Sequence, residues 1–564
     1  MYLTDVQHKS IVGKEKNLLL SPTTNLLIVM KRTTLLTVVC FLFIQSVIAG
    51  GLLTNANQSA QYMRMLSRNA STDLDAVYFN PAGVMEMANG FHFGFHSQTL
   101  FQTRTITTTA PLNNQEFVGN LEIPVFPTAF AVYKKDNWAF SFGLGPNAGG
   151  GSVVFDEGIP SFEGKIATQV NGQLVPALAG LAAFGYEVQP GYGAAIEFEG
   201  RSVFWGIQLG ATTKLSEAVS VYGGVRVLPS INTYTGGISN IQLKVNGSMT
   251  NAEQFLLGAS TSVGAAATNA ANAAAGMQPL IDNGAGGYTL DQVEQGGYIS
   301  AAERTQIEQG LMGLGATQAQ IDAMQITQIQ GTFSAGATVL NATANELEEN
   351  SALLKDQEVD TKQTGTGFTP ILGVNISPSD KLNIGLKYEF QTALKLTNDT
   401  KVDDTGMFPD KAESRSDIPA ILSVGVNYKP SKKWLTSVSF INYFDKGVDW
   451  GNNIYGQERI IESGLWELSA GVQYSITDRF ALSVGGMQST TGVSEQYQSD
   501  FSYSNSSNSM AFGLQWKATD QLTLDAGVLY TTYKDEDKSF GTYTETYDKE
   551  NLGLAIGLSY SIFK

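Results

Sequence analysis

Residues 552–562, near the C-terminus, read LGLAIGLSYSI, and this stretch decides the fold class. Larger apolar or aromatic residues occupy every even position, and Gly, Ala or Ser occupies every odd one. Strict alternation predicts a β-strand, because successive side chains of a strand point to opposite faces of a sheet. An apolar outer face with a small or polar inner face suits a strand embedded in lipid. A soluble sandwich with its apolar face inward would show the same pattern, so alternation alone leaves both folds open.

Comparable runs recur along most of the chain and give a count of fourteen strands. Residues 382–391 are the clearest of them, with Leu382, Ile384 and Leu386 on one face. The predicted strands cover about 91–103, 126–133, 138–145, 203–209, 219–227, 366–376, 382–391, 419–429, 433–447, 464–476, 480–492, 508–518, 522–535 and 552–562.

The lengths of the connections separate the two folds. Short turns alternate with long loops, and the predicted short turns are 134–137, 215–217, 377–380, 430–432, 477–479 and 519–521. Outer-membrane barrels have an even number of strands, short turns on one side and longer loops on the other, whereas sandwiches have no reason to sort loops by length. Backbone groups in lipid also require a closed sheet. The sequence therefore predicts an all-β protein, a 14-stranded antiparallel transmembrane β-barrel at residues 91–564.

The composition agrees with this fold. The chain has 564 residues, of which 15% are charged, against roughly 25% in soluble globular proteins. It contains 59 Gly, 29 Phe and 22 Tyr, which is typical of all-β proteins. The net charge of −17 argues against a nucleic-acid partner, since a basic surface is needed to neutralise phosphates.

Residues 30–49 have the three parts of a secretory signal peptide. Met30-Lys31-Arg32 is followed by an apolar run from Leu35 and by Val47-Ile48-Ala49 as a cleavage site. A membrane anchor is the alternative, but the run is too short to span a bilayer comfortably. Residues 1–29 are then an upstream extension. The single cysteine, Cys40, lies in the apolar run, so the mature chain offers neither disulfides nor thiol chemistry.

Residues 50–90 are short, mostly polar, and predicted to be a plug (hatch) inside the barrel. Asn80 is placed to cap a helix start through its side-chain oxygen, and Pro81 suits the first helical position. Residues 57–69 are a second helical candidate. An ordinary folded N-terminal arm remains the alternative reading.

Residues 235–365 interrupt the alternation and are predicted to form a helical extracellular insertion. The stretch 264–276 is rich in Ala, and 340–354 is a further helical candidate. Ser300-x-x-Glu303 and Thr317-x-x-Gln320 have the spacing of capping boxes. The helices would form a small packed cap or, alternatively, a dedicated binding surface.

The signal peptide, the polar arm and the fourteen strands together resemble the outer-membrane long-chain fatty-acid transporter family (FadL/TodX-like outer membrane protein transport protein). The most specific local feature is the plug motif Phe79, Asn80, Pro81, Ala82 and Gly83. The resemblance implies a plug that gates the lumen, passive uptake of hydrophobic small molecules, and a kinked third strand that gives a lateral exit.

Gly143, Gly145 and Pro146 fit the kink, because Gly and Pro both interrupt regular pairing. Two departures from the family stand out: the unusually Ala/Gly-rich third outer loop, and the ending Ile562-Phe563-Lys564, which replaces a terminal aromatic.

Residues that carry chemistry are few. His92 and His96, four residues apart on one strand, would lie roughly 13 Å apart, too far to share a metal. No nucleophile motif accompanies them, so we expect no catalytic site, no metal and no cofactor. Arg226 and Lys387 face inward and are candidates for contact with an anionic head group. The alternative is that they pair with Glu389, Glu467 or Asp525 and hold the plug.

Trp138, Trp434, Trp466 and Trp516, near strand ends, are expected in interface girdles rather than at a ligand. We expect an outer-membrane channel of a Gram-negative bacterium, monomeric, in contact with outer-membrane lipids, and taking up a fatty acid or an aromatic hydrocarbon. The alternative is a structural or surface-interaction barrel with a closed lumen.

Overall fold

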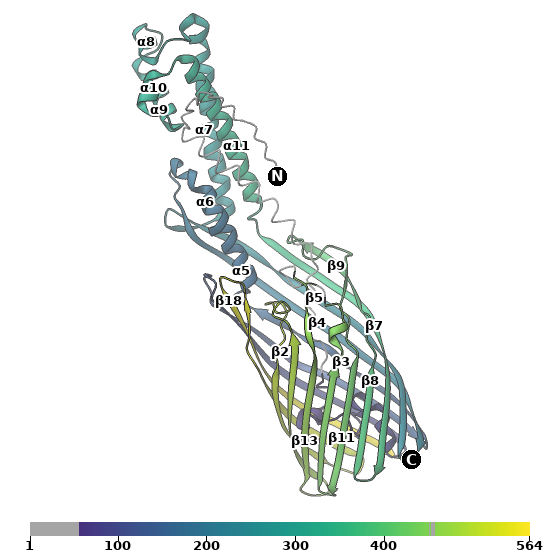
Figure 1. Ribbon diagram of the computed structural model, residues 1–564. Coiled ribbons are helices and arrows are strands. Elements are labelled where there is room, and N and C mark those ends of the chain that lie inside the picture. Colours follow the sequence, from purple (N-terminus) through teal and green to yellow (C-terminus); the bar gives the residue numbers. More distant parts are fainter. Residues whose placement is uncertain (1–55, 451, 453–456, 564) are drawn as a thin grey trace, which may run out of the picture. The chain divides into compact units, whose positions relative to one another are not determined.

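A closed antiparallel barrel of fourteen strands dominates the computed structural model, which describes residues 56–450, 452 and 457–563 (Figure 1). The predicted signal peptide and upstream extension lie outside the described residues. The barrel strands are β1 (Gly90–Thr108), β2 (Glu116–Lys135), β3 (Trp138–Phe155), β4 (Val188–Ser216), β5 (Val219–Val245), β7 (Gln357–Ser379), β8 (Leu382–Glu389), β11 (Ile421–Ser431), β12 (Trp434–Tyr443), β13 (Ile461–Ser475), β14 (Phe480–Val493), β15 (Ser507–Lys517), β16 (Leu522–Tyr533) and β18 (Thr544–Phe563).

The sheet closes where the first strand meets the last. β1 pairs antiparallel with β18 from Gly90↔Phe563 to Thr108↔Glu545. Each of the six predicted short turns joins two consecutive strands, for example Asp136 and Asn137 between β2 and β3. The predicted strand count and the alternation of turns and loops are therefore confirmed.

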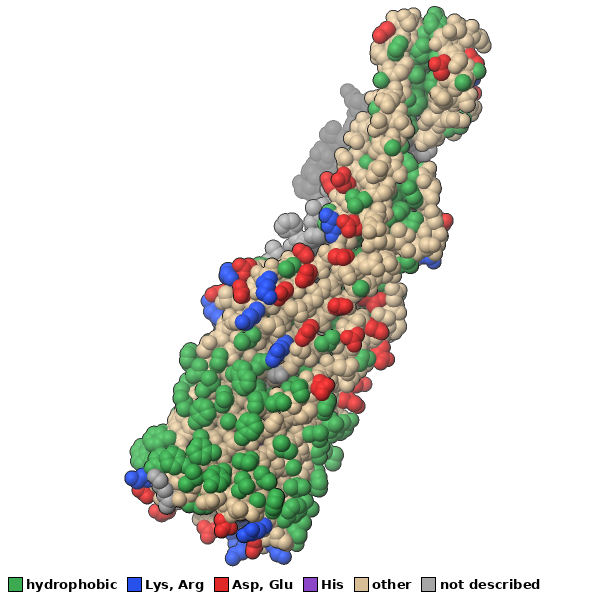
Figure 2. Space-filling view, turned by 180° about the vertical axis from the view of Figure 1, so that it is seen from behind, with side chains coloured by type: hydrophobic (Ala, Val, Ile, Leu, Met, Phe, Trp, Pro, Cys, Tyr) green, Lys and Arg blue, Asp and Glu red, His purple; other side chains and the backbone are tan. Residues whose placement is uncertain are grey.

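In the barrel wall, large apolar side chains face outward and small or polar ones face inward, the reverse of a soluble protein. On β18, Leu554 and Ile556 are exposed, whereas Ala555 between them is buried against the contents of the lumen. Figure 2 shows the resulting apolar band on the face of the wall in view, bordered by charged residues at the end that carries the short turns. Trp138, Trp434 and Trp516 are all about half exposed on this outer face, as expected of an interfacial girdle.

Several strands extend well beyond their predicted ends, most of all β4 and β5. The alternation of apolar and small residues stops at about residue 227, and the fifth strand was therefore predicted to end there. The backbone ladder nevertheless continues, and β5 stays paired with β7 as far as Ile238↔Gln357. Four short strands extend the sheet further. They are β6 (Ser248–Asn251), which pairs with β5, β9 (Lys395–Asp403), which pairs with β7, β10 (Glu413–Arg415), which pairs with β9, and β17 (Glu536–Ser539), which pairs with β18.

The helices of the insertion occupy a narrower range than the predicted 235–365, because 235–245 and 357–365 belong to β5 and β7. They are α7 (Ala252–Leu280), η6 (Ile281–Ala285), α8 (Leu290–Gln295), α9 (Ala301–Gly313), α10 (Gln318–Ala323) and α11 (Ile326–Ala352). Both predicted capping boxes are confirmed, at Ser300 and at Thr317. Among the described residues, no helix is both long and apolar enough to cross a membrane.

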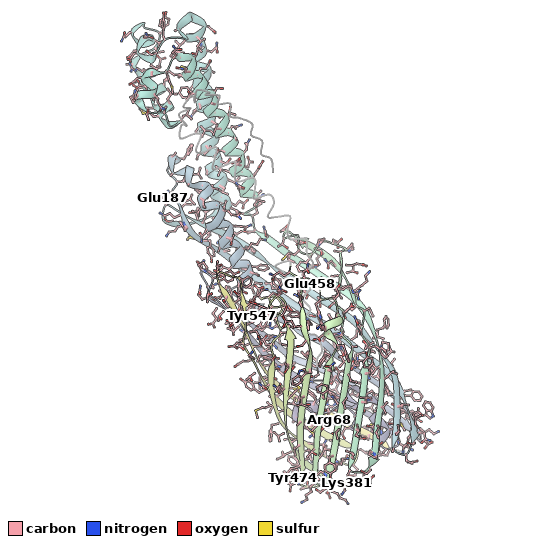
Figure 3. All side chains as sticks on the ribbon, in the orientation of Figure 1. Arg68, Glu187, Lys381, Glu458, Tyr474 and Tyr547 are labelled. Atoms are coloured by element: carbon pink, nitrogen blue, oxygen red, sulfur yellow. The ribbon has the colours of Figure 1, made fainter. Side chains whose placement is uncertain are left out.

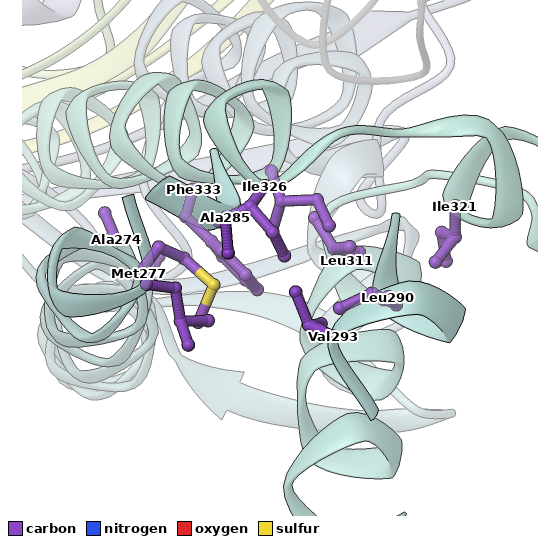
Figure 4. Packing of buried hydrophobic residues seen from close by; sticks show 12 residues of the cluster. Ala274, Met277, Ala285, Leu290, Val293, Leu311, Ile321, Ile326 and Phe333 are labelled. Carbon is purple, nitrogen blue, oxygen red and sulfur yellow. The ribbon is translucent and has the colours of Figure 1, made fainter. Parts of the chain in front are cut away.

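The insertion has a hydrophobic core of its own. Met277 of α7 and Phe333 of α11 pack with Leu290, Leu311 and Ile326 from the shorter helices, as Figure 4 shows. Along the rest of the hairpin, buried residues recur every three or four positions on α7 and α11, the spacing of two helices packed along one seam. The described unit is thus a small packed helical body.

Shorter helices complete the chain. The plug contains α3 (Ala60–Met65), α4 (Ala76–Phe79) and η3 (Pro81–Glu86). The loop between β3 and β4 contains α5 (Pro160–Ala167), η4 (Thr168–Leu174), α6 (Val175–Ala177) and η5 (Leu178–Phe184), and η7 (Asp445–Gly447) follows β12.

Candidate functional site: the plug, the wall and the cavity between them

Residues 56–89 lie inside the barrel and contact the wall on several sides. Helix α3 packs against β13, β14, β15, β16, β18 and β1, while η3 packs against β2, β3, β7 and β8. Figure 3 labels Arg68 of this segment within the ring of strands. We call residues 56–89 the plug.

An ion cluster around the buried Arg68 and Asp75 side chains, with Asp73 half exposed at its edge, fixes the fold of the plug itself. Arg68 Nη2 donates to Asp73 Oδ2 (2.6 Å) and to Asp75 Oδ1 (2.7 Å), and Nε donates to Asp75 Oδ2 (2.9 Å). Ser59 Oγ and Ser71 Oγ donate to the same Asp75 carboxylate. Burial would raise the pKa of the Asp73 carboxyl, but the charge and hydrogen bond of Arg68 outweigh it and lower that pKa from its ordinary 3.8.

A second buried ion pair joins the plug to the wall. Arg64 Nε donates to Asp525 Oδ1 of β16 at 3.0 Å, and both side chains are almost fully buried. Arg64 Nη1 also donates to Gln473 Oε1 and to Ser483 Oγ on neighbouring strands. Breaking a buried, hydrogen-bonded pair by removing one partner costs roughly 3–5 kcal/mol, so this contact holds the plug firmly.

The plug motif Phe79–Gly83 is pressed onto the opposite side of the wall. Asn80 stands at the N-cap position of η3 with Pro81 as its first residue, but its side chain makes no capping hydrogen bond. Instead Asn80 Nδ2 donates to Asn375 Oδ1 of β7 at 2.7 Å, since the barrel wall offers a buried acceptor. The wall also donates to the motif's backbone, from Thr212 to the Pro81 carbonyl and from Ser220 to the Ala82 carbonyl.

Arg226 and Lys387 both pair with the carboxylate of Glu389, and both lie against the aromatic ring of Tyr78 in the plug. Glu389 Oε2 lies 2.5 Å from Arg226 Nη1, and Glu389 Oε1 lies 2.6 Å from Lys387 Nζ. The ring of Tyr78 stands 4.8 Å from Arg226 Cζ and 4.7 Å from Lys387 Nζ, and the Tyr78 carbonyl accepts from Lys387. This geometry supports the second of the two roles considered for these cations, that of holding the plug.

Inward glycines let the plug approach the wall. A Cβ added to Gly485 would lie 2.0 Å from the Met65 carbonyl oxygen, and one on Gly385 would lie 2.1 Å from that of Asn69. Gly425, Gly471 and Gly527 are similarly tight against the plug. The small inner face of the strands is thus set by close contact with the plug backbone.

The ladder between β2 and β3 is interrupted halfway. The two strands are paired up to Leu121↔Val153 and again from Ala129↔Leu144, with no regular pairing between. Gly145 and Pro146 lie at the edge of the gap, Gly143 just before it, and the ladder of β3 with β4 is also irregular beside Pro146 and at Gly149. The residues predicted to kink the third strand therefore lie next to a break in the wall.

One plug residue, Gln58, spans this break. Its Nε2 donates to the Pro146 carbonyl of β3 at 2.8 Å, and its own carbonyl accepts from Thr128 Oγ1 of β2 at 2.7 Å. Between Gln58, Tyr78 and Arg226 only a void of about 10 Å³ remains, about the space of one water. The plug therefore closes the break from within.

A separate, partly open cavity of about 460 Å³ is lined by residues of the plug, the wall and the loops. Ala56, Asn57 and Tyr62 line it from the plug. Its apolar lining comes mainly from Leu100, Leu121, Ile123, Phe155, Ile159 and Leu529. The volume falls in the range of small-molecule sites, and polar and apolar groups contribute about equally to the lining.

The two histidines lie at the boundary between plug and wall. His92 has ring nitrogens 2.8 Å from Ser561 Oγ and 2.9 Å from the Ala88 carbonyl oxygen. The buried ring of His96 accepts a long hydrogen bond from the Ala60 N–H through Nδ1. Within the described part of the chain, no group of three or more His, Cys, Asp or Glu could hold a metal ion.

Comparison with known proteins also indicates an outer-membrane transport protein. The sequence model of the family described as outer membrane protein transport protein (OMPP1/FadL/TodX) matches residues 308–561. No curated protein matches the chain. This matched part, somewhat less than half of the chain, is similar to the FadL/TodX outer membrane proteins.

Solved structures share the fold of this FadL/TodX-like barrel. A Pseudomonas aeruginosa FadL homologue is 12% identical and superposes with a TM-score of 0.53, over 91% of this chain and 99% of that one. The Pseudomonas putida toluene transporter TodX is also 12% identical, with a TM-score of 0.45 over 87% and 95% of the two chains. At such identities the first comparison shows a common fold, which is that of an outer-membrane β-barrel.

Sequence reasoning missed several residues of this FadL/TodX-like site. Gln58 falls in the predicted plug, but nothing in its local pattern indicates a contact with the third strand. Arg104 and Lys549 line the cavity, and only the pairing of the first strand with the last brings them together. The alternation in the sequence predicts that these side chains face inward, but it does not predict which strand pairs with which.

Proposed function

We propose that this outer-membrane barrel is a channel for the passive uptake of hydrophobic small molecules, with long-chain fatty acids as its cargo. The plug acts as the gate, and the interrupted β2–β3 ladder is the lateral exit towards the membrane. One observation carries the proposal: the cavity and the break in the wall share residues. Ile123 of β2 and Gly149 and Gly151 of β3 all line the cavity and lie in the unpaired stretches.

The contacts of Gln58 indicate what must move. A ligand in the cavity reaches the wall at the unpaired stretch, where few backbone hydrogen bonds hold β2 and β3 together. Gln58 bridges the two strands beside this stretch, so passage requires its hydrogen bonds to Thr128 and Pro146 to open. Such local opening needs only a small displacement of residues 56–59, while Arg64 and Asn80 keep the rest of the plug in place.

A disulfide lock tests this function. The only native cysteine is Cys40, so Gln58→Cys combined with Thr128→Cys introduces a single pair between plug and wall. Uptake of labelled dodecanoate and labelled toluene into proteoliposomes is measured with the pair oxidised and reduced. We expect uptake to stop on oxidation and to return on reduction. The matched control is Thr103→Cys with Asn120→Cys, a directly opposed pair in the intact β1–β2 ladder, where oxidation should change nothing.

The same assay separates the alternative, a structural or surface-interaction barrel with a closed lumen. Such a barrel would raise the uptake of neither compound above that of empty liposomes in either redox state. A variant that lacks residues 252–352 adds a second comparison. A channel retains its uptake without these helices, whereas a barrel that serves to present them loses its partner binding and has no uptake to lose.

A further inference from the structure

Three segments at the loop end of the barrel meet around buried charged side chains. Asp500 lies in the loop between β14 and β15, Lys538 lies on β17, and Glu545 lies at the start of β18. Each of the three is at most 3% exposed, a depth at which charged residues are rare unless they are paired. The exposed apolar side chains of β18 begin at Leu552, so these three residues lie outside the part that faces lipid. We call Asp500, Lys538 and Glu545 the latch cluster.

Each member of the latch cluster holds a segment of loop or strand. Asp500 Oδ2 accepts a hydrogen bond of 2.8 Å from the backbone N–H of Ser161 in the first turn of α5, where the helix dipole favours a carboxylate. Lys538 Nζ donates to the Gln498 carbonyl at 2.6 Å. The Tyr547 hydroxyl donates to Glu545 Oε2 at 2.7 Å, and Figure 3 labels Tyr547 at the end of the barrel away from the short turns. The cluster therefore fastens the β3–β4 loop, the β14–β15 loop and the β17–β18 hairpin together.

The charges of this region do not balance when every group is ionised. Lys538 stands directly opposite Glu545 in the β17–β18 ladder, and the charge of Asp500 acts on both of them. Glu495 and Arg459, which carry opposite charges, also face Lys538. These described residues comprise three carboxylates and two cations, so full ionisation leaves one negative charge in excess. Burying an uncompensated charge is strongly unfavourable, and one proton bound to a carboxyl removes the excess.

Asp500 and Glu545 share that proton. Burial, and then the charge of Asp500, raise the pKa of Glu545 to about 8, and burial raises the pKa of Asp500 as well. Burial lowers the pKa of Lys538 to about 8, so its amine is charged below that pH. Tyr543 and Tyr547 face the same carboxylates, and burial raises the pKa of both phenols, which keeps them neutral. The carboxyl pair is therefore the part of the latch cluster that gains or loses a proton near neutral pH.

The segments that the latch cluster fastens also line the cavity. Asp500 and Phe501 contribute to the lining from the β14–β15 loop, and Ile159 contributes from the residue before α5. The Phe501 ring packs edge-on against Phe162 and Phe198, with centroid distances of 5.4 Å and 4.9 Å. Release of the β14–β15 loop from α5 would therefore change the access of a ligand to the cavity.

We propose that the proton shared by Asp500 and Glu545 works as a pH-dependent latch, which fastens the β14–β15 loop to α5 in acid and loosens it as the pH rises through neutrality. This proposal rests on the proposed function, since it names a regulation of access to the same cavity. In a released loop the two carboxyls meet water and ionise near their ordinary pKa values of 3.8 and 4.5. Between about pH 4.5 and pH 8 the fastened state thus binds a proton that the released state lacks, so fastening weakens with rising pH, by up to about tenfold per pH unit.

The test is hydrogen exchange of the full-length protein in lipid nanodiscs, without ligand, at about pH 5.5, 6.5 and 7.5, below the range in which Lys538 loses its charge. Each rate is divided by the intrinsic exchange rate at that pH, which leaves the protection due to structure. We expect protection of residues 494–506 to fall by up to about tenfold per pH unit in the wild type. Glu545→Gln stays neutral and still accepts from Tyr547, so its protection should not change with pH. Glu550→Gln, which alters an exposed carboxylate on the same strand, is the matched control and should keep the wild-type slope.

Asp500→Asn gives a second test that does not depend on the folding of the first variant. It leaves Glu545 to pair with Lys538 without a competing carboxylate, so the pH dependence of protection should flatten here too. Wild-type protection that does not change with pH, or a wild-type slope in either Glu545→Gln or Asp500→Asn, would overturn the proposal. Failure of the disulfide lock would concern transport alone, because the exchange experiment contains no ligand and measures no uptake.

Discussion

Asn80 of the plug donates a hydrogen bond of 2.7 Å from Nδ2 to Asn375 Oδ1 on strand β7. The same Nδ2 donates to the Ser71 carbonyl at 2.9 Å, so one amide ties two parts of the plug to the wall. Asn80 is fully buried. A residue that sequence reasoning assigned to helix capping is therefore an anchor between the plug and the barrel.

Replacing this anchor should loosen the plug. Asn80→Ala removes the donor to the Ser71 carbonyl and one of the two donors to Asn375 Oδ1, which keeps the hydrogen bond from Asn383 Nδ2, at a cost of about 1–3 kcal/mol. We expect faster proteolysis of residues 56–89 and greater leakage of small solutes through the barrel. The same change at Asn341, exposed on helix α11, should alter neither. Wild-type proteolysis of Asn80→Ala would show that the anchor is dispensable.

The Gln58 bridge makes a prediction about local mobility. Gln58→Ala removes the donor to the Pro146 carbonyl at the edge of the break. Hydrogen exchange of the backbone amides in 145–152 should then accelerate, while exchange in 138–144 keeps its rate. Uptake of hydrophobic compounds should rise, because the closure costs less to open. Equal exchange in both segments before and after the change would contradict a role for Gln58 in closing the break.

Glycine contacts predict an overpacking effect. Gly485→Ala places a methyl group against the Met65 carbonyl, and the plug must shift at a cost of about 1–3 kcal/mol. The thermal unfolding midpoint should fall, with increased access of protease to the plug. Gly223 is the matched control, because a Cβ there meets nothing within 4 Å. If Gly223→Ala and Gly485→Ala lower the midpoint equally, the effect belongs to the strand and not to the plug.

Acid should weaken the plug through Asp73. Its pKa is lowered in the folded protein, because Arg68 outweighs the opposing effect of burial. A depressed pKa means that the carboxylate stabilises the fold above its ordinary, unfolded pKa of 3.8. That contribution is lost as the pH falls through the lower, folded value. Since the Asp73 side chain is 52% exposed, solvent screens the pair and the effect is modest.

The measurement compares wild type with Asp73→Asn between pH 6 and pH 2. Other carboxylates titrate in the same range, so only the difference in unfolding midpoint between the two proteins reports on Asp73. This difference should be constant down to about pH 4 and then shrink towards zero. A difference that does not change with pH would assign the effect of the substitution to lost hydrogen bonding alone.

Much of the barrel could be predicted because lipid imposes a simple rule. Exposed Leu554 and Ile556 alternate with small residues, and the period of two, with turn lengths, was enough to count strands. The outer ends of β4 and β5 were not predicted because buried positions there, such as Ser230 and Asn232, are polar, so the sequence shows no apolar alternation although burial still alternates. Capping boxes such as Ser300 with Glu303 could be predicted because they act over three residues.

The site could be predicted only in part, for a physical reason. The position of Arg226 facing inward follows from register, but its partner Glu389 is set by the packing of one strand against others far along the chain. The same holds for Arg104, which needs the C-terminal strand to become one of a pair. Local pattern gives the face on which a side chain lies, while tertiary pairing gives what it meets.

The seam between β1 and β18 has a consequence for biogenesis. The plug precedes β1 in the chain, yet the sheet around it closes only through β18, so the barrel cannot close before β18 is present. Contacts so distant in sequence form slowly. The plug must therefore already lie between the strands when β1 pairs with β18. A variant that lacks the plug is expected to insert as an empty barrel. The pairing of the first strand with the last thus determines the order of assembly.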